Sequence, residues 1–406
     1  MIVIYGSVSI LWKRETSNLI YIIKYLKEKT FSMMKSISLC VILWLVTASQ
    51  MVAQPKFDKA EVKSWMKRVA DWQIANPNKE AEHDDLDWTH AALYMGMVDW
   101  AELTENEDGD SSYYKWLLRI GRRNHFQMGK WMYHADFIAV GQPFIDLYRK
   151  YGEIKMIAPV MARANWVVDN LPETTLELDY SRIETLSRWS WCDALFMAPP
   201  VYAKLYAQTL DKKYLNFLNR EYKATYDYLY DKEEQMFYRD RRYFDKREAN
   251  GKKVFWGRGN GWVLGGLAEI LQALPGDEPS RKFYQDLFVT LATRVVGLQS
   301  PDGYWHASLL DPESYPSPET SATGFIVYAL AYGVNEGLLD KATFLPVVAK
   351  GWKALVDAVD ADGKLGYVQP IGADPRKVTR DMTEVYGVGA FLMAGCQICR
   401  LAESAD

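Results

Sequence analysis

The chain has 406 residues, of which 49% are hydrophobic and 25% are charged, and its formal net charge is −4. This is the composition of a globular protein with enough chain for one large or two medium domains, and it excludes a disordered chain. The negative balance argues against a nucleic acid as the partner.

The first feature along the chain is a predicted export signal that starts at an internal methionine. A Met-Met-Lys triplet begins at Met33, a short apolar run follows, and small and polar residues lead to Ala53. This order predicts a signal peptide at 33–53, cleaved before Gln54, and a protein that is periplasmic or secreted. The apolar run is too short to anchor the mature protein stably in a membrane. Residues 1–32 are then an upstream start-site artefact, or alternatively a genuine extension with an anchor helix.

Removal of residues 1–53 makes the chain more acidic and leaves few cysteines. These residues carry six Lys or Arg and two Asp or Glu, so the net charge falls from −4 to −8. Cys192, Cys396 and Cys399 remain, an odd number without framework spacing, so we expect a fold that does not depend on disulfides. The CxxC pair lies in an apolar helical segment without a second pair, which favours core packing over a zinc or redox site.

Helical periodicity dominates from Phe57 to the end of the chain. Stop signals such as Asn76-Pro77 and Leu274-Pro275-Gly276 separate successive segments. The twelve predicted helices cover about 57–75, 88–104, 111–125, 136–151, 154–170, 192–209, 212–229, 259–274, 279–298, 320–337, 341–359 and 382–403. Several tryptophans lie in the middle of these segments and are expected in the core, namely Trp72, Trp116, Trp166 and Trp352.

A weak internal repeat accompanies the helices. A turn and a short aromatic stretch, predicted as a strand, follow three of them, at 231–238, 300–305 and 360–367. Twelve helices in six antiparallel pairs can close into a ring that buries one face of every helix without a sheet. The sequence therefore predicts an all-α fold, an (α/α)6 barrel with short β-hairpins in its loops. No linker divides 54–406, which we interpret as one domain.

The inner helices of such a ring should be the less charged ones, and polar, aromatic-rich loops at their N-terminal ends should form a cleft. We expect the inner helices to open at Trp88, Asp136, Asp193, Gly259, Ser321 and Met382. One of these openings is the run Trp256-Gly-Arg-Gly-Asn-Gly-Trp262. Its glycines allow close backbone approach, and Arg258 beside a helix N-terminus suits a carboxylate. The run fits either a pocket for an acidic sugar or a helix entrance with packing glycines and core tryptophans.

Two further openings carry an aspartate, Asp136 in His-Ala-Asp and Asp193 in Trp-Ser-Trp-Cys-Asp. An aspartate at a helix start is often only a cap. The aromatic residues around Asp193 should exclude water and favour the protonated carboxylic acid, which suits a general acid. His134 is either a binding residue or a structural histidine. Because no metal-binding or nucleotide-binding motif is present, we expect neither a metal nor a cofactor.

Together these motifs resemble glycoside hydrolase family 105, the unsaturated rhamnogalacturonyl hydrolases, which are related to the family 88 unsaturated glucuronyl hydrolases. The resemblance covers most of 57–403 and rests on Trp256 to Trp262, Trp191-Cys-Asp193 with Phe196-Met197, and His134-Ala-Asp136 with Gly141-Gln142. It implies an (α/α)6 barrel. It also implies hydration of the C4=C5 enol ether of an unsaturated uronic acid, which polysaccharide lyases leave at the non-reducing end of an oligosaccharide.

The resemblance also implies roles for individual residues. Asp193 would protonate C4 and help to deliver water to C5, and Asp136 would hold the sugar hydroxyls and tune the charge at Asp193. The remaining candidates for substrate binding are Arg258 at the uronate carboxylate, Trp191 and Trp262 on the ring, and Trp88 and His134 in the same subsite. Some members have a histidine where this chain has Phe237-Tyr-Arg-Asp240, so Arg239 either takes over that contact or binds a different leaving sugar.

The leading hypothesis is an exported hydrolase of unsaturated uronyl oligosaccharides, with pectin rhamnogalacturonan fragments as the expected substrate. One alternative is a toroidal glycosidase or epimerase that acts on saturated sugars, although only five histidines are available for an epimerase. Another is a non-catalytic toroid that binds glycans, in which Asp193 has no special environment.

Overall fold

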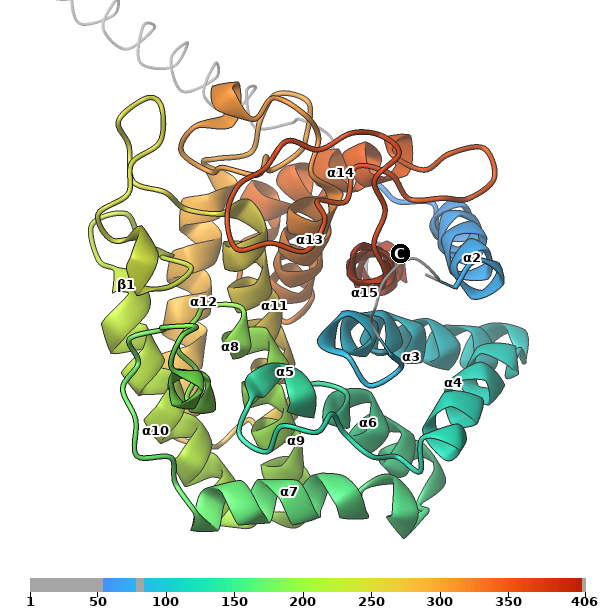
Figure 1. Cartoon of the computed structure of the whole chain (residues 1–406). Helices are drawn as coiled ribbons and strands as arrows, with labels where there is room; N and C mark the ends of the chain where they lie inside the picture. Colours follow the sequence, from blue (N-terminus) through green and yellow to red (C-terminus); the bar gives the residue numbers. More distant parts are fainter. Residues whose placement is uncertain (1–53, 78–83, 404–406) are drawn as a thin grey trace, which may run out of the picture. The chain divides into compact units, whose positions relative to one another are not determined.

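Six helices form a closed inner ring in the computed structural model, which describes residues 54–77 and 84–403 (Figure 1). They are α3 (Trp88–Asp108), α6 (Gly141–Tyr151), α9 (Pro199–Thr209), α11 (Gly257–Ala273), α13 (Thr320–Asn335) and α15 (Val385–Glu403). Each helix packs against the next in this order, and α15 packs against α3, which closes the ring. The predicted inner helices are therefore confirmed.

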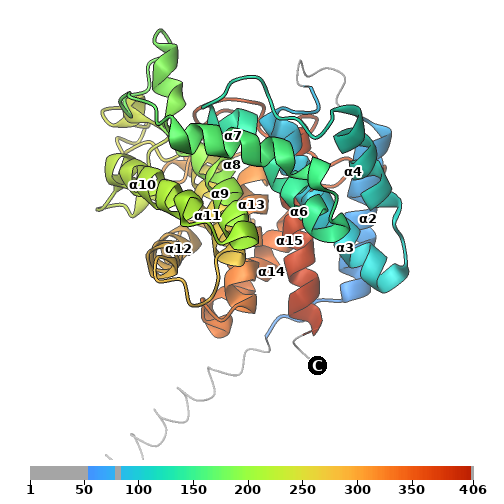
Figure 2. The ribbon, with the colours of Figure 1, turned by 90° about the horizontal axis from the view of Figure 1, so that it is seen from below.

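Six further helices surround the ring. They are α2 (Lys59–Ala75), α4 (Ser112–Arg123), α7 (Ala158–Asp169), α10 (Lys212–Leu229), α12 (Arg281–Val296) and α14 (Lys341–Asp357). Each outer helix packs on the inner helix before it, and α2 packs on α15. Outer and inner helices alternate along the chain, so the predicted (α/α)6 arrangement is confirmed. The view turned by 90° shows the inner and outer helices packed together (Figure 2).

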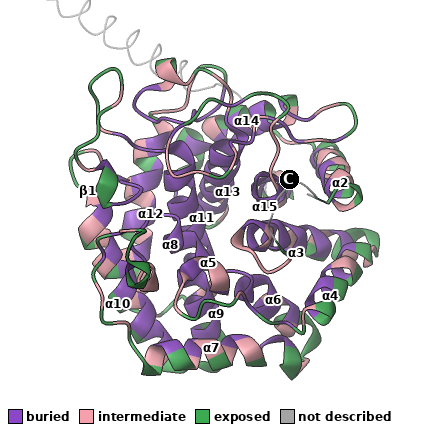
Figure 3. Ribbon diagram, in the orientation of Figure 1, coloured by how far each residue is buried: buried purple, intermediate pink, exposed green. Residues whose placement is uncertain are grey.

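Burial separates the two layers (Figure 3). Every residue of Gly257–Leu271 in α11 and of Thr320–Val334 in α13 is buried, whereas the outer helices are exposed on one face. The inner helices approach one another closely because small residues line their contacts. A Cβ atom on Gly96 of α3 would collide with the backbone of Gly389 on α15. Glycine is therefore required at this crossing, where the ring closes.

Two inner segments that the sequence predicts as continuous helices are broken at the mouth of the ring. The short helices α5 (Ala135–Ile138) and α8 (Ala194–Met197) precede α6 and α9. Pro199 and Pro200 open α9 and have no amide hydrogen to donate, which explains the break after α8. The breaks place Asp136 and Asp193 on separate short turns above the ring rather than on its long helices.

The loops contain fewer strands than predicted. The stretch 231–238 forms a hairpin of β1 (Tyr230–Asp231) and β2 (Met236–Phe237). The stretch 360–367 makes only an isolated bridge, and 300–305 forms a turn, so the strand prediction is wrong there. Four short 3-10 helices complete the described chain: η1 (Ile154–Met156), η2 (Ile183–Ser187), η3 (Arg241–Tyr243) and η4 (Pro312–Ser314).

A cluster of buried charges lies inside the ring, away from the starts of the inner helices. Lys204 Nζ on α9 lies 2.5 Å from Asp146 Oδ2 on α6 and 3.3 Å from Glu269 Oε2 on α11. Glu269 also accepts a hydrogen bond from the Tyr328 hydroxyl on α13. Burial, and then the charge of Glu269, hold the pKa of the nearby Asp99 carboxyl well above its ordinary value. The ammonium group of Lys204 therefore provides the counter-charge for more than one carboxyl group, and the cluster lines a cavity of about 360 Å³.

Pro55–Asp406 forms one compact unit, and the predicted signal peptide lies outside the described residues. Cys192, Cys396 and Cys399 are free thiols. Among the described helices, only α15 is long and apolar enough to cross a membrane by length and composition, and 83% of its most apolar window is buried inside the protein. The CxxC pair on α15 thus lies on a core helix.

Candidate active site

The predicted catalytic residues meet at the mouth of the ring, where α5 and α8 begin. Asp136 lies in the first turn of α5, and Asp193 directly precedes α8. The His134 ring connects the two segments, because it lies 5.0 Å from the Trp191 ring and its Nδ1 is 3.8 Å from Asp136 Oδ2. The structure therefore brings residues from two distant stretches of sequence into one cluster.

Asp193 is buried and faces a positive charge. Its Oδ2 atom lies 3.4 Å from Arg239 Nε and 3.5 Å from the Cys192 thiol. The loop after β2 sets this geometry, because the Cys192 amide donates a hydrogen bond to the Arg239 carbonyl at 2.8 Å. Asp193 thus has a polar partner as well as the aromatic neighbours expected from the sequence.

Asp136 is the carboxyl group that the site keeps protonated. Burial, and then the charges of Asp193 and Asp87, raise the pKa of Asp136 to about 8, although the charge of Arg239 opposes them. The sequence predicted such an effect at Asp193, whereas the structure shows it at Asp136, on which the charges of two other aspartates act. Asp193 lies beside the guanidinium group of Arg239. Two carboxyl groups in different surroundings are the usual equipment of a general acid–base pair.

His134 is neutral at physiological pH. Burial, and then the nearby Arg239, lower the pKa of His134 to about 4. Its Nδ1 atom accepts a hydrogen bond from the Asp136 amide at 3.2 Å, which caps α5. Because the ring is uncharged, its 3.8 Å approach to the Asp136 carboxyl is not an ion pair. His134 thus positions Asp136 through the backbone.

Arg239 is held in place by a small network on the open side of Asp193. Its Nη1 atom donates to Asp240 at 2.8 Å and to the Tyr180 hydroxyl at 3.1 Å. Arg242 also donates to Asp240 and lies over the Tyr180 ring, 4.7 Å from its centroid. Tyr180, which the sequence analysis missed, is 56% exposed. It follows Asp179 in an irregular loop, so no periodicity or motif identifies it.

Both terminal nitrogen atoms of the Arg258 guanidinium group already donate hydrogen bonds within the protein. Its Nη1 donates to the Gln369 carbonyl and, at 3.1 Å, to the Tyr386 hydroxyl, and its Nη2 donates to the Pro370 carbonyl at 3.0 Å. The guanidinium lies between two rings, 4.5 Å from Trp256 and 4.9 Å from Tyr386. In this structure Arg258 therefore ties the loop at 369–370 to the start of α11.

Two buried donors remain unused next to this tie. Arg258 Nε and Trp262 Nε1, four residues apart on α11, have no hydrogen-bond partner among the described residues. Trp262 itself is fully buried and packs on Phe325, with ring centroids 4.0 Å apart. Buried donors without a partner are costly, so they mark a place where an acceptor would be stabilised.

The remaining predicted aromatic residues lie beside Arg258 or beside the cluster of His134, Asp136 and Asp193. Trp88 is half-buried at the start of α3 and stacks on Tyr386, with centroids 5.4 Å apart. It also meets the edge of Trp262 at 6.0 Å. Trp191 is buried and faces His134. Trp88 and Tyr386 thus adjoin the Arg258 tie, and no sequence signal marks Tyr386 because it lies in an apolar core helix.

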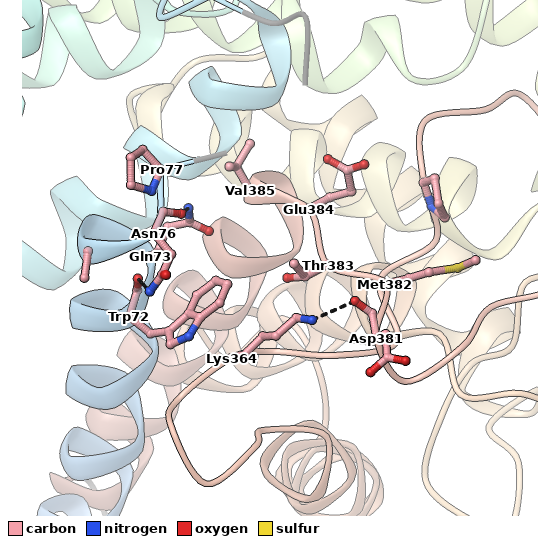
Figure 4. Close-up of a pocket in the computed structure, with 12 residues that line it drawn as sticks. Trp72, Gln73, Asn76, Pro77, Lys364, Asp381, Met382, Thr383, Glu384 and Val385 are labelled. Atoms are coloured by element: carbon pink, nitrogen blue, oxygen red, sulfur yellow. Dashed lines mark hydrogen bonds between the residues drawn. The ribbon is translucent and has the colours of Figure 1, made fainter. Parts of the chain in front are cut away.

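A separate cavity of about 540 Å³ lies between the end of α2 and the start of α15. Trp72, Lys364 and Thr383 line it, and Lys364 reaches the Asp381 carbonyl at 2.8 Å (Figure 4). None of the predicted site residues lines this cavity. Within 54–77 and 84–403, no group of three or more His, Cys, Asp or Glu side chains is arranged to hold a metal ion.

Comparison with known proteins finds a family and several relatives that match most of the chain. The family described as Glycosyl Hydrolase Family 88 matches residues 59–402. The chain is 38% identical over 379 residues to an unsaturated 3S-rhamnoglycuronyl hydrolase from Formosa agariphila, covering 91% of this chain and 99% of that protein. It is 34% identical to a protein of the same name from an Alteromonas species, covering 83% and 86%. A solved family 88 structure from Bacteroides vulgatus superposes with a TM-score of 0.76 at 30% identity, covering 85% of this chain and 99% of that one.

Proposed function

The chain belongs to glycosyl hydrolase family 88, which is grouped with the related family 105. From this premise we propose that it releases an unsaturated uronic acid from the non-reducing end of lyase-generated oligosaccharides. The observation that carries the proposal is the pair of aspartates in different surroundings at the mouth of the ring, Asp136 with a raised pKa and Asp193 beside Arg239. Breaking a linkage by hydration needs a group that gives a proton and a group that takes one.

In the proposed reaction a proton passes from Asp193 to C4 of the enol ether, and water adds at C5. Asp193 takes up the proton that the water loses, so the carboxyl group is restored. The resulting hemiketal opens and expels the neighbouring sugar. Arg239 lies 3.4 Å from Asp193 and stabilises its carboxylate whenever the proton has left.

Asp136 has a supporting role in this scheme. Its protonated carboxyl group donates a hydrogen bond to a sugar hydroxyl, and it is the local store from which Asp193 is protonated. His134 fixes its position through the cap on α5. The unused donors Arg258 Nε and Trp262 Nε1 support a place for the uronate carboxylate on α11, through one N–H of Arg258 rather than through its fork.

The identity of the leaving sugar is the finer part of the proposal. The Formosa and Alteromonas relatives are named for a sulfated rhamnose linked to the uronate. We therefore propose an unsaturated uronyl group on 3-sulfated rhamnose as the first substrate to test. The rhamnogalacturonan disaccharide predicted from the sequence is the second. The proposal assigns the contact with this sugar to Arg239 and Tyr180, which hydrogen-bond to each other at 3.1 Å.

The test is to incubate the mature protein with both kinds of oligosaccharide and follow the ultraviolet absorbance of the conjugated enol-ether acid. Loss of absorbance together with release of the uronate supports the proposal. Turnover of saturated sugars only would favour a glycosidase or an epimerase. Binding without any turnover would favour a glycan-binding toroid.

The proposed role of Asp136 predicts a pH dependence. A raised pKa of about 8 means that the carboxyl group is protonated below pH 8 and loses its proton above it. We therefore expect kcat/KM to fall as the pH rises through about 8, and Asp136→Asn to lack this alkaline limb although its rate is lower. Rates from pH 5 to 10, with circular dichroism as a check of folding, test this. An unchanged limb in Asp136→Asn would assign it to another group.

Export is a separate proposal. It is supported by the signal-like segment at 33–53 and by the acidic remainder of the chain. N-terminal sequencing of the protein made in its natural host should begin near Gln54. Recovery of an intact Met1 would contradict both the cleavage and the start-site prediction.

A further inference from the structure

We propose that an exposed group of aromatic side chains beside the catalytic cluster is a sugar-binding subsite. The group consists of Trp131, Tyr133 and Trp166, which we call the aromatic platform. Its ligand would be the pyranose units of the substrate chain that lie beyond the bond that is cleaved. The inference rests on the proposed function in that it needs an oligosaccharide whose unsaturated end occupies the catalytic cluster.

The platform exposes large apolar rings that the fold does not need to expose. Trp131 is 39% exposed and Trp166 is 42% exposed, whereas most other tryptophans of the described chain are buried or half-buried. The sequence placed Trp166 in the core, because it lies in the middle of α7, and the structure corrects this. Exposed aromatic area that persists in a folded protein is typical of a surface that binds a ligand.

Trp131 is held in a fixed orientation. One face of its indole stacks on Phe137, with centroids 5.4 Å apart and planes 21° apart. Arg163 of α7 donates to the carbonyl groups of Gly129, Trp131 and Phe137, which fixes the loop from both ends. A Cβ atom on Gly129 would collide with the Phe137 ring, so glycine is required there. A ring fixed in this way loses little conformational entropy when a ligand stacks on it.

Tyr133 and Trp166 form the second part of the platform. Their ring centroids are 5.2 Å apart, and the Tyr133 hydroxyl donates to the Asn170 carbonyl at 2.6 Å. The tyrosine of the loop is thereby fixed to the end of α7. Both parts of the platform thus depend on α7, through the Arg163 side chain in one case and the Asn170 carbonyl in the other.

The platform is continuous with the catalytic cluster. The Trp131 ring lies 5.6 Å from the His134 ring, and His134 lies against both Asp136 and Trp191. When the terminal uronate of a substrate occupies the cluster, the remaining sugars of the substrate must extend out of the cluster. Flat rings pack on the C–H faces of sugars, and they favour an uncharged or apolar face such as that of a deoxysugar. The chemistry of the platform thus suits the continuing chain and not the uronate itself.

The test compares two substrates that share the same unsaturated end, a disaccharide and a tetrasaccharide. Trp166→Ala and Trp131→Ala are each expected to raise KM for the tetrasaccharide about three- to tenfold. For the disaccharide, KM should change less than about twofold, because the lost ring lies outside its reach. Trp131→Phe keeps a flat ring and should lie between Trp131→Ala and the wild type. Leu210→Ala, which removes an exposed apolar side chain at the far end of α9, serves as the matched control.

Other outcomes overturn the inference. Equal KM values for the tetrasaccharide in all variants would exclude a subsite. A loss that is the same for both substrates would place the rings in the catalytic cluster instead. Dissociation of a dimer by Trp131→Ala in sedimentation, without an effect on KM, would show an interface between copies. If the wild type consumes neither substrate, the proposed function fails, and a fluorescence titration with the tetrasaccharide still tests the platform.

Discussion

Asp193→Asn is expected to lower kcat/KM on unsaturated oligosaccharides by about 10²- to 10⁴-fold, the contribution typical of a general acid–base group. The amide has the size of the carboxylic acid but cannot give its proton to C4 or take one from water. The oxygen of the introduced amide can still accept a contact from Arg239, so the loop after β2 should keep its position. The initial rate of absorbance loss measures the effect.

The matched control for this variant is Asp245→Asn, which removes an exposed carboxylate a few residues beyond Arg239. It should retain the wild-type rate. Both variants should unfold at nearly the wild-type temperature, which would separate lost chemistry from lost structure. Retention of most of the activity by Asp193→Asn would exclude Asp193 as the proton donor.

Lys204→Met is expected to cost about 3–5 kcal/mol of the free energy of unfolding, because it leaves buried carboxylates without their counter-charge. Lys204 lies 2.5 Å from Asp146 Oδ2 and 3.3 Å from Glu269 Oε2. Methionine has a similar length and keeps the packing of the stem. Urea unfolding at pH 7 measures the loss.

Two comparisons make this prediction specific. The triple variant Lys204→Met, Asp146→Asn, Glu269→Gln should recover most of the lost stability, because it also removes the charge of the two carboxylates that Lys204 contacts. Lys213→Met, at a half-buried lysine on α10 whose ion-pair partner Asp211 is exposed, should change stability by less than about 0.5 kcal/mol. A similar loss in both lysine variants would contradict the argument.

The ring was predictable from sequence because its cause is local. Outer helices such as α4 and α10 show a helical period of apolar residues, inner helices such as α13 are long apolar segments, and stop signals such as Leu274-Pro275 separate the helices. The breaks at α5 and α8 were not predicted in place, although Pro199 and Pro200 carry the signal for one of them. The strand predictions at 300–305 and 360–367 failed because a turn followed by aromatic residues does not reveal whether a pairing partner is within reach.

The positions of Asp136 and Asp193 at helix starts were also predictable, but their electrostatics were not. The raised pKa of Asp136 reflects its burial and the charges of Asp193 and Asp87, which Arg239 opposes, and none of these three residues is a sequence neighbour of Asp136. Arg258 is a similar case. An arginine in a glycine-rich run looks free for a ligand, and only the folded loop at 369–370 shows that its fork is occupied.

The closure of the ring has a consequence for how the chain acquires its structure. The last inner helix, α15, packs against both α3 and α13, and α2 packs on α15. Lys59 at the start of α2 forms an ion pair with Glu403 at the end of α15. A chain that has emerged only as far as α14 therefore has two open apolar flanks, and contacts between such distant segments form late. Completion of the C-terminal helix is the step that joins the two ends of the barrel and covers its last exposed seam.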